Sequence, residues 1–252
     1  MSNVSGIVVT HEPDPVLAHC ITALAPQVDE LVLVANLPLE LELPSNARLL
    51  VNERPRGFSA NVNRGVAETR GEFVVIANPD TDPAPDAVRM LREFAAERTR
   101  CGIAGPQLRY PDGHRQPSRR SFPTVRGTLV RRTPLRRALH PERRQRRHYL
   151  LDEQPNEPVR SDWLLGAFLL LRRQMLEELD GLDEGYRLYG EDIDLAYRAR
   201  QAGWERWYVP EAVVVHHHQA VTDRRFLTRR TLWHWRSIAR FVRKHPESLR
   251  AF

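Results

Sequence analysis

The sequence contains little cysteine and no long hydrophobic run. Its two cysteines, Cys20 and Cys101, are too few for a multi-bridge disulfide framework and form no Cys-x-x-Cys pair, which favours a reducing compartment. The longest apolar run, Trp163–Leu171, is far shorter than the ~20 residues that span a bilayer. Residues 1–12 lack the basic and apolar regions of a secretory signal. We therefore expect a cytoplasmic protein, or one bound peripherally at the inner face of the cell membrane.

Lysine is nearly absent too, because Lys244 is the only lysine among 38 basic residues. The 38 Lys+Arg residues outnumber 32 Asp+Glu and give a formal charge of +6. With 41% hydrophobic and 28% charged residues, the chain has enough apolar material for a packed interior, which excludes a disordered tail. A length of 252 residues lies near the upper limit of about 250–300 for one hydrophobic core.

Strand and helix patterns alternate over the first hundred residues. Helices between strands imply right-handed βαβ units, so we predict the α/β class with a mostly parallel central sheet flanked by helices. The expected strands are Ile7–Thr10, Leu31–Ala35, Arg48–Val51 and Phe73–Ala77. The expected helices are Pro15–Leu24, Ser59–Thr69 and Asp86–Arg98.

Paired arginines and prolines interrupt this pattern between residues 115 and 147. We expect one domain over 1–220, in which a mobile basic loop (111–160) joins the halves 1–110 and 161–220, and a helical tail over 221–252. The strands predicted after the loop are Trp163–Arg172, Trp204–Val209 and Ala212–His216. The predicted helices are Gln174–Leu179, Glu191–Ala202 with Gly203 as a left-handed cap, and an amphipathic Asp223–Lys244.

Polar residues follow three of the predicted strands: Thr10-His11, Asn36 and Asn78-Pro79-Asp80. Ligands of open parallel sheets bind beyond the carboxyl ends of the strands, so these residues indicate a site. Asp80 suits a hard divalent cation, which takes one or two protein carboxylates and completes its shell with phosphates and water. The alternative is an ordinary turn whose aspartates cap the next helix.

Glu191 and Asp192 open a predicted helix, where the helix dipole favours ionised carboxylates. An ionised carboxylate that faces a cleft can take a proton from a substrate hydroxyl. Plain helix capping by either residue is the alternative.

Three consecutive histidines, His216 to His218, follow a valine-rich strand. Alternation along the strand sends His216 and His218 to one face and His217 to the other. A buried, hydrogen-bonded histidine is one interpretation, and a metal ligand is the other if Asp80 lies nearby. An imidazole ligand favours Mn²⁺ over Mg²⁺.

The order of these motifs resembles the inverting family 2 glycosyltransferases of the GT-A fold, especially the rhamnosyltransferase-like branch that builds cell-surface polysaccharides and cell wall. The resemblance covers roughly residues 5 to 245. Its motifs are Ile7–Thr10, Gly57–Gly65, Gly71–Phe73, Asn78–Asp80, Trp163–Ala167, Leu182–Glu184, Tyr189–Leu195, Ala202–Trp204 and Val209–His216.

The resemblance implies a role for each matching residue. Asp192 would be the catalytic base on the acceptor hydroxyl, and Asp80 with His216 would hold the metal ion. The acceptor would be bound by Trp163, Gly166 and Glu191. The sugar nucleotide would be bound by Thr10, His11, Asn36, Asn63, Arg64, Asn78 and Asp80.

The resemblance also implies a reaction and its partners. A sugar would move from a nucleoside-diphosphate donor to a hydroxyl of a glycan or polyprenyl-linked acceptor in one inverting displacement. The branch points to rhamnose on thymidine diphosphate, with galactose, glucose or N-acetyl sugars on UDP as alternatives. Three departures lie in the donor pocket: His11-Glu12 replaces a tyrosine-asparagine pair, and Asn36 and Asn78 each replace an aspartate.

Two alternatives remain for the function. The donor-pocket departures are compatible with a catalytically silent GT-A protein that only binds sugar nucleotides. The basic loop and the Trp- and Arg-rich tail are compatible with a nucleic-acid binder, although no familiar nucleic-acid motif is present and we expect no nucleic-acid partner. The same tail, with Trp233, Trp235 and Phe241, either contacts an anionic membrane or packs on the domain.

Overall fold

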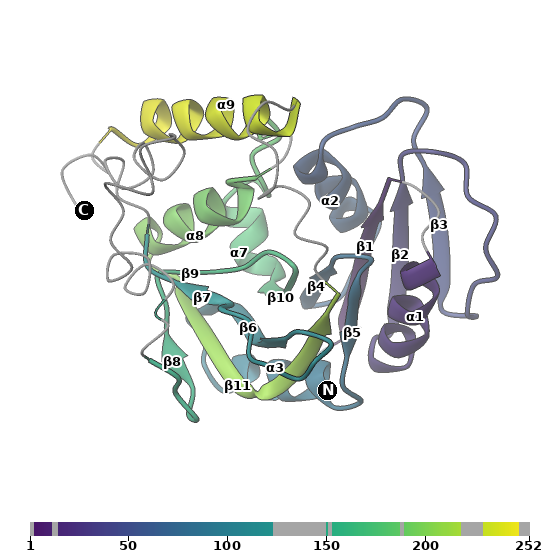
Figure 1. The fold of residues 1–252 in the computed structure, drawn as a ribbon, viewed down its shortest axis with the longest axis horizontal. Helices are drawn as coiled ribbons and strands as arrows, with labels where there is room; N and C mark the ends of the chain where they lie inside the picture. The colour runs from purple at the N-terminus through teal and green to yellow at the C-terminus, as the bar shows by residue number, and fades with distance from the viewer. Residues whose placement is uncertain are drawn as a thin grey trace.

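The computed structural model describes residues 3–11, 15–122, 150, 153–186, 189–217 and 229–246 (Figure 1). Its strands are β1 (Val4–Thr10), β2 (Glu30–Ala35), β3 (Ala47–Val51), β4 (Phe73–Ala77), β5 (Thr81–Pro83), β6 (Cys101–Arg109), β7 (Arg119–Arg120), β8 (Val159–Arg160), β9 (Trp163–Leu164), β10 (Phe168–Arg172) and β11 (Glu205–His216). Its helices are α1 (Pro15–Leu24), the 3-10 turn η1 (Ala25–Gln27), α2 (Phe58–Ala67), α3 (Ala87–Ala96), α7 (Arg173–Glu178), α8 (Glu191–Gln201) and α9 (Arg229–Lys244).

One large sheet, in the order β3-β2-β1-β4-β10-β6-β11-β5, forms the centre of the molecule. Strands β3, β2, β1 and β4 are parallel neighbours, and β6 and β11 run parallel to each other. Strand β10 is antiparallel to β4 and β6, and β5 is antiparallel to β11. The predicted α/β class with a mostly parallel central sheet is confirmed.

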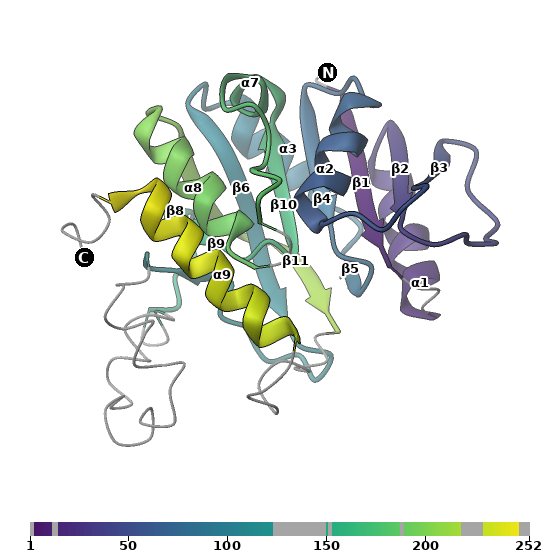
Figure 2. The same ribbon diagram turned by 90° about the horizontal axis from the view of Figure 1, so that it is seen from above.

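Apolar side chains alternate between the two faces of the sheet and build a separate core on each. In β1, Val4 and Val8 belong to the core under α1 and α3, whereas Ile7 and Val9 belong to the core under α2, α7 and α8. The result is three layers, helices on both faces of one sheet. Figures 1 and 2 show α9 lying beside α8 on the outside of the second helical layer.

Several predicted elements have different bounds in the structure. The predicted strand Trp163–Arg172 is divided into β9 and β10, because Leu165 N–H donates to Ser118 O (2.8 Å) and Gly166 N–H donates to the Asp192 carboxylate (3.2 Å) instead of extending the sheet. The two strands predicted on either side of Pro210 form one strand, β11. A register shift between Val209 and Val213 absorbs the proline, which has no N–H to donate.

Strand β6 was not predicted, although it lies within the sheet between β10 and β11. Its sequence contains Gly102, Gly105 and Pro106, residue types depleted in strands. Packing explains the glycines, since a Cβ on Gly102 would lie 2.5 Å from Met175 Sδ and one on Gly105 would lie 3.0 Å from Leu164 Cδ1.

The predicted basic loop and tail are described only in part. Residues 119–120 and 159–160 of the loop form β7 and β8, and residues 123–149 lie outside the described part. The tail helix begins at Arg229 in the structure, and its predicted first residues also lie outside the described ranges. Within those ranges, we find no helix whose length and hydrophobicity would allow it to cross a bilayer.

Candidate functional site

Asp80 and His216 meet at the carboxyl edge of the sheet. Asp80 lies in the turn that joins β4 to β5, and His216 is the last residue of β11. His216 Nε2 lies 3.5 Å from Asp80 Oδ1, and the backbone N–H of His217 donates to Asp80 O (2.8 Å). Pairing of His216 with Thr81 across the antiparallel strands brings these residues together from positions more than 130 apart in the chain.

The ring of His216 is held by a residue that the sequence did not single out. Its Nδ1 lies 2.9 Å from the Oε1 atom of Gln116, and both side chains are buried. An amide oxygen only accepts, so the Nδ1–H group donates to Gln116, and Nε2 is the ring nitrogen that faces Asp80. Orientation of this kind prepares an imidazole for a metal ion.

Two protein ligands fit a divalent cation that takes its other ligands from a substrate diphosphate and water. Asp80 offers a carboxylate, and its side chain is 26% exposed, so the group is in contact with solvent. Among the described residues, no cluster of three or more histidine, cysteine or acidic side chains is arranged as a closed metal site. The Asp80–His216 pair therefore suits a metal ion shared with a substrate.

Asp192 lies in the first turn of α8 and faces the segment between β9 and β10. Its Oδ2 accepts the backbone N–H of Gly166 (3.2 Å) and its Oδ1 accepts that of Ile193 (2.9 Å). A Cβ on Gly166 would lie 3.2 Å from Asp192 Cβ, so glycine allows the close approach. Gly190, the residue before α8, has a φ of 91°, in the left-handed region that favours glycine.

Glu191 and Asp192 form an adjacent pair of carboxyl groups with unequal surroundings. Burial, followed by repulsion from Asp192, raises the pKa of Glu191 to about 8, and Glu191 Oε2 is buried with no hydrogen-bond partner among the described residues. Burial also raises the pKa of Asp192, but the Gly166 and Ile193 N–H groups and the charge of Arg120 oppose that rise. With a pKa of about 8, Glu191 keeps its proton near pH 7, and the two N–H groups and Arg120 favour Asp192 as the member of the pair that ionises first.

The backbone connects the Asp80 and Asp192 groups across the edge of β4 and β10. Asn78 N–H donates to Ala167 O (2.8 Å), and Ala167 follows Gly166, which contacts Asp192. Thr81 N–H and its hydroxyl both donate to Asn78 O, at 3.2 and 2.7 Å, which fixes the turn that carries Asp80. Both carboxylates thus belong to one run of contacts at one edge of the sheet.

A buried amide network occupies the ends of β1 and β2. Asn36 Nδ2 contacts His11 Nδ1 and donates to Arg56 O (3.1 Å). Asn36 Oδ1 accepts from Asn52 Nδ2 (2.8 Å) and Asn61 Nδ2 (3.2 Å). The amide of Asn36 is thus used within the protein and orients the exposed ring of His11, while the buried Thr10 accepts the Asn36 N–H on its carbonyl oxygen (3.1 Å).

Three other predicted site residues make contacts inside the protein. Asn63 on α2 donates to Leu182 O (2.8 Å) and accepts the Leu182 N–H (2.9 Å), so it ties α2 to the loop before α8. Arg64 donates to Val51 O (3.0 Å) and Asn52 Oδ1 (2.6 Å) at the end of β3. Trp163 is 3% exposed and donates from its indole to Ser121 O (2.9 Å). Contacts of these three residues with substrate stay predictions.

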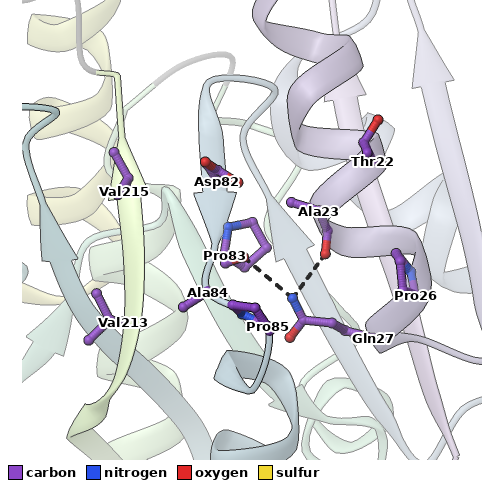
Figure 3. A pocket seen from close by; sticks show the side chains of 10 residues that line it. All are labelled: Thr22, Ala23, Pro26, Gln27, Asp82, Pro83, Ala84, Pro85, Val213 and Val215. Carbon is purple, nitrogen blue, oxygen red and sulfur yellow. Dashed lines mark hydrogen bonds between the residues drawn. The ribbon is translucent and has the colours of Figure 1, made fainter.

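A separate hollow of about 450 Å³ lies between α1, β5 and β11 (Figure 3). Its walls are mostly apolar or proline, and Gln27 crosses it with bonds to Ala23 O (2.9 Å) and Pro83 O (3.5 Å). Asp82 lines this hollow, whereas Asp80, Asp192 and His216 do not. Asp82, in β5, therefore faces a different part of the surface from Asp80, in the turn before β5.

Comparison with known sequences identifies a family and several relatives of this chain. Residues 4–235 match the family described as "Glycosyltransferase like family 2". The N-acetylglucosaminyl-diphospho-decaprenol L-rhamnosyltransferase of Mycobacterium tuberculosis strain H37Rv is 36% identical over 199 residues, 71% of this chain and 61% of the relative. The rhamnosyltransferase WbbL of Escherichia coli K12 is 37% identical over 105 residues, 39% of each chain. The chain thus spans about three fifths of the length of its mycobacterial relative.

Solved structures show the same fold at low sequence identity. GalNAc-T7 with UDP, GalNAc and Mn²⁺ is similar over 85% of this chain and 44% of that protein, with a TM-score of 0.63 and 17% identity. The mannosyltransferase PcManGT of Pyrobaculum calidifontis, with GDP-Man and Mn²⁺, is similar over 100% of this chain and 65% of its own, with a TM-score of 0.59 and 17% identity. The expected GT-A fold is confirmed by these similarities.

Proposed function

Since the chain belongs to the glycosyltransferase-like family 2, we propose that it moves a sugar, rhamnose as the first choice, from a nucleoside-diphosphate donor to a hydroxyl of a lipid-linked glycan. The observation that carries this proposal is the run of contacts from Asp192 through Gly166 and Asn78 to the Asp80–His216 pair. These residues would supply a general base for an alcohol and a binding site for a diphosphate at one edge of the sheet.

Asp192 acts as the general base in this reaction. Two backbone N–H groups stabilise its carboxylate form, which takes the proton as the acceptor oxygen attacks C1 of the sugar. The anomeric configuration inverts in that single step, and the nucleoside diphosphate leaves. The protonated Glu191 can donate a hydrogen bond to the acceptor beside the base.

Asp80 and His216 would hold a divalent cation at the diphosphate end of the donor. Such a cation would offset the charge that builds on the leaving diphosphate. The imidazole nitrogen, fixed by Gln116, favours Mn²⁺ over Mg²⁺ because Mg²⁺ prefers oxygen ligands. His11, held by Asn36, supports binding of the nucleotide base at the ends of β1 and β2.

The acceptor is inferred from the mycobacterial relative, whose name gives an N-acetylglucosaminyl-diphospho-decaprenol substrate. An acceptor on a lipid implies work at a membrane surface. The outer face of α9 fits this role, since Trp235 is half-buried and Arg236 and Ala239 are exposed, whereas Phe241 packs on the domain, 5.5 Å from the ring of Tyr197. Arg236 gives that face a charge that attracts anionic lipid.

A thermal-shift panel followed by a transfer assay tests the proposal. Nucleoside diphosphates and their sugars, each with and without Mn²⁺, should raise the melting temperature selectively, because a bound ligand stabilises by RT ln(1 + [L]/Kd). The stabilising donor is then incubated with a polyprenyl-diphosphate-linked N-acetylglucosamine and labelled transfer is measured. Donor binding without transfer would favour the silent sugar-nucleotide binder, and the absence of both would refute the proposal.

A further inference from the structure

Helix α9 packs its inner face against the helix that carries the proposed base. Ser237, Phe241 and His245 on this face are 6%, 9% and 4% exposed. The rings of Phe241 and His245 contact Tyr197 of α8, with centroids 5.5 and 4.6 Å away. Figure 2 shows the two helices side by side, so α9 is part of the folded domain.

Asp194, two residues after the proposed base, connects the two helices by charge. Its carboxylate is fully buried and accepts bonds from Arg198 Nε (2.6 Å), Lys244 Nζ (3.0 Å) and His245 Nε2 (2.9 Å). Only Arg198 belongs to α8 itself. A buried carboxylate needs such partners, and two of them come from the end of α9.

Asp183, in the loop that precedes α8, makes a second connection to α9. It accepts from Arg240 Nη2 (2.6 Å) and from the same Lys244 Nζ (2.7 Å). Burial disfavours its charge, but Arg240 and Lys244 outweigh burial and hold the pKa of Asp183 well below its usual range. Lys244, the one lysine of the chain, therefore bridges Asp183 and Asp194 on both sides of the turn that presents Asp192.

That turn is also enclosed sterically by α9. A Cβ on Gly190 would lie 3.4 Å from the ring of Tyr186 and 3.5 Å from Ser237 Cβ on α9. The Tyr186 hydroxyl in turn donates to Asp194 (3.3 Å), and Ser59 on α2 donates to Tyr186 O (3.2 Å). The left-handed Gly190 thus has packed neighbours behind it, in direct sequence with Glu191 and Asp192.

We propose that Lys244, with Arg240, is a positioning residue for sugar transfer: by bridging Asp183 and Asp194 it fixes the start of α8 and the direction of the Asp192 carboxylate. This inference rests on the proposed function, in which Asp192 is the base. It assigns α9 to the catalytic unit, because its ion pairs join the two segments that flank the base. Small displacements of a reacting group are costly, about a hundredfold in rate for 1 Å.

The test compares Lys244→Met with Lys244→Arg, which keeps the charge, and with Arg243→Met, a change at the exposed preceding residue of the same helix. We expect Lys244→Met to lower kcat about tenfold or more while the Kd of the nucleoside diphosphate with Mn²⁺ stays unchanged, because Asp80 and His216 are untouched. Lys244→Arg should restore most of the rate, and Arg243→Met should behave as wild type with a detergent-dissolved acceptor.

Amide hydrogen exchange over residues 189–195 gives a readout independent of activity. Lys244→Met should speed exchange there, and Lys244→Arg should not. A Lys244→Met protein that melts earlier but keeps its kcat and its exchange would overturn the proposal and leave the lysine a purely stabilising role. A wild-type protein that transfers no sugar would defeat the proposed function instead, and the exchange comparison would still decide whether Lys244 anchors the turn. Should Lys244→Met not fold, Asp183→Asn is measured in its place, with the same expectations.

Discussion

Replacing Glu191 by Gln should change how the stability of the protein depends on pH. The pKa of Glu191 rises from 4.5 to about 8 in the folded state, first because the group is buried and second because Asp192 lies beside it. Below pH 4.5 the carboxyl holds its proton in both states. Between pH 4.5 and 8 the unfolded chain releases that proton while the folded chain keeps it, so the free energy of unfolding falls as the pH rises.

The size of the effect follows from the span of pH that the group crosses. From pH 4.5 to 7 the folded carboxyl resists ionisation over 2.5 pH units, and one unit corresponds to about 1.36 kcal/mol. Glu191 therefore costs the native state about 3 kcal/mol at pH 7 relative to pH 4.5. Glutamine has a similar shape and carries no such cost. Between pH 4.5 and 7, the free energy of unfolding of Glu191→Gln should therefore rise by about 3 kcal/mol relative to that of wild type.

Urea unfolding followed by tryptophan fluorescence at pH 4.5, 6, 7 and 8 measures the difference. Glu177→Gln, the same chemical change at an exposed position of α7, is the matched control and should track wild type at every pH. If the Glu191→Gln and wild-type curves run parallel from pH 4.5 to 8, Glu191 is ionised in the native protein. In that case the division of charge between Glu191 and Asp192 is wrong.

Four other predictions concern the site and the tail. Asp192→Asn should keep nucleotide binding and lower transfer at least about a hundredfold, as loss of a general base does, and a normal rate would contradict the assignment. Asp80→Ala should abolish Mn²⁺-dependent nucleotide binding in calorimetry, whereas Asp82→Ala, in the separate hollow, should not. Gln116→Leu should weaken Mn²⁺ affinity about ten- to a hundredfold, as loss of an outer-shell partner does, and unchanged affinity would remove its orienting role. Trp235→Ala should reduce flotation with anionic liposomes while neutral liposomes bind neither protein, and equal flotation would argue against membrane contact through α9.

Sequence patterns predicted those elements whose residue types match the burial of the element in the fold. Strand β4 matches the predicted Phe73–Ala77, because an unbroken apolar run suits a strand buried on both faces. Strand β6 was missed because its glycines leave room for Met175 and Leu164, residues far away in the chain. Strand propensity is read from neighbouring residues in the sequence, so it cannot reveal that another layer of the fold packs closely against the strand.

Motif order brought out the residues at strand ends, but not their partners. Asp80 was singled out as a candidate by its place after β4, whereas Gln116 has no sequence signal of its own and becomes a candidate only because its amide oxygen reaches His216. Asn63 shows the opposite case, since it lies in a matching motif but its amide binds the loop at Leu182. A motif indicates which residue types recur in a family, whereas the contacts that those residues make are visible only in the folded structure.

The segment from Asp183 to Asp194 shows why these long-range partners matter for chemistry. Five carboxyl groups lie between residues 183 and 194, and four of them have donors: cations for Asp183 and Asp194, the Asn63 amide for Glu184, and backbone N–H groups for Asp192. Glu191 alone has an oxygen buried without a partner in the described structure, so it is the group that stays protonated. A neutral Glu191 places no second negative charge beside Asp192. Asp194, which is bound by Lys244, holds the same helical turn in place. In the proposed mechanism, Asp192 would then combine a stabilised charge with a fixed position, two requirements that a single carboxylate on an exposed helix end would not meet together.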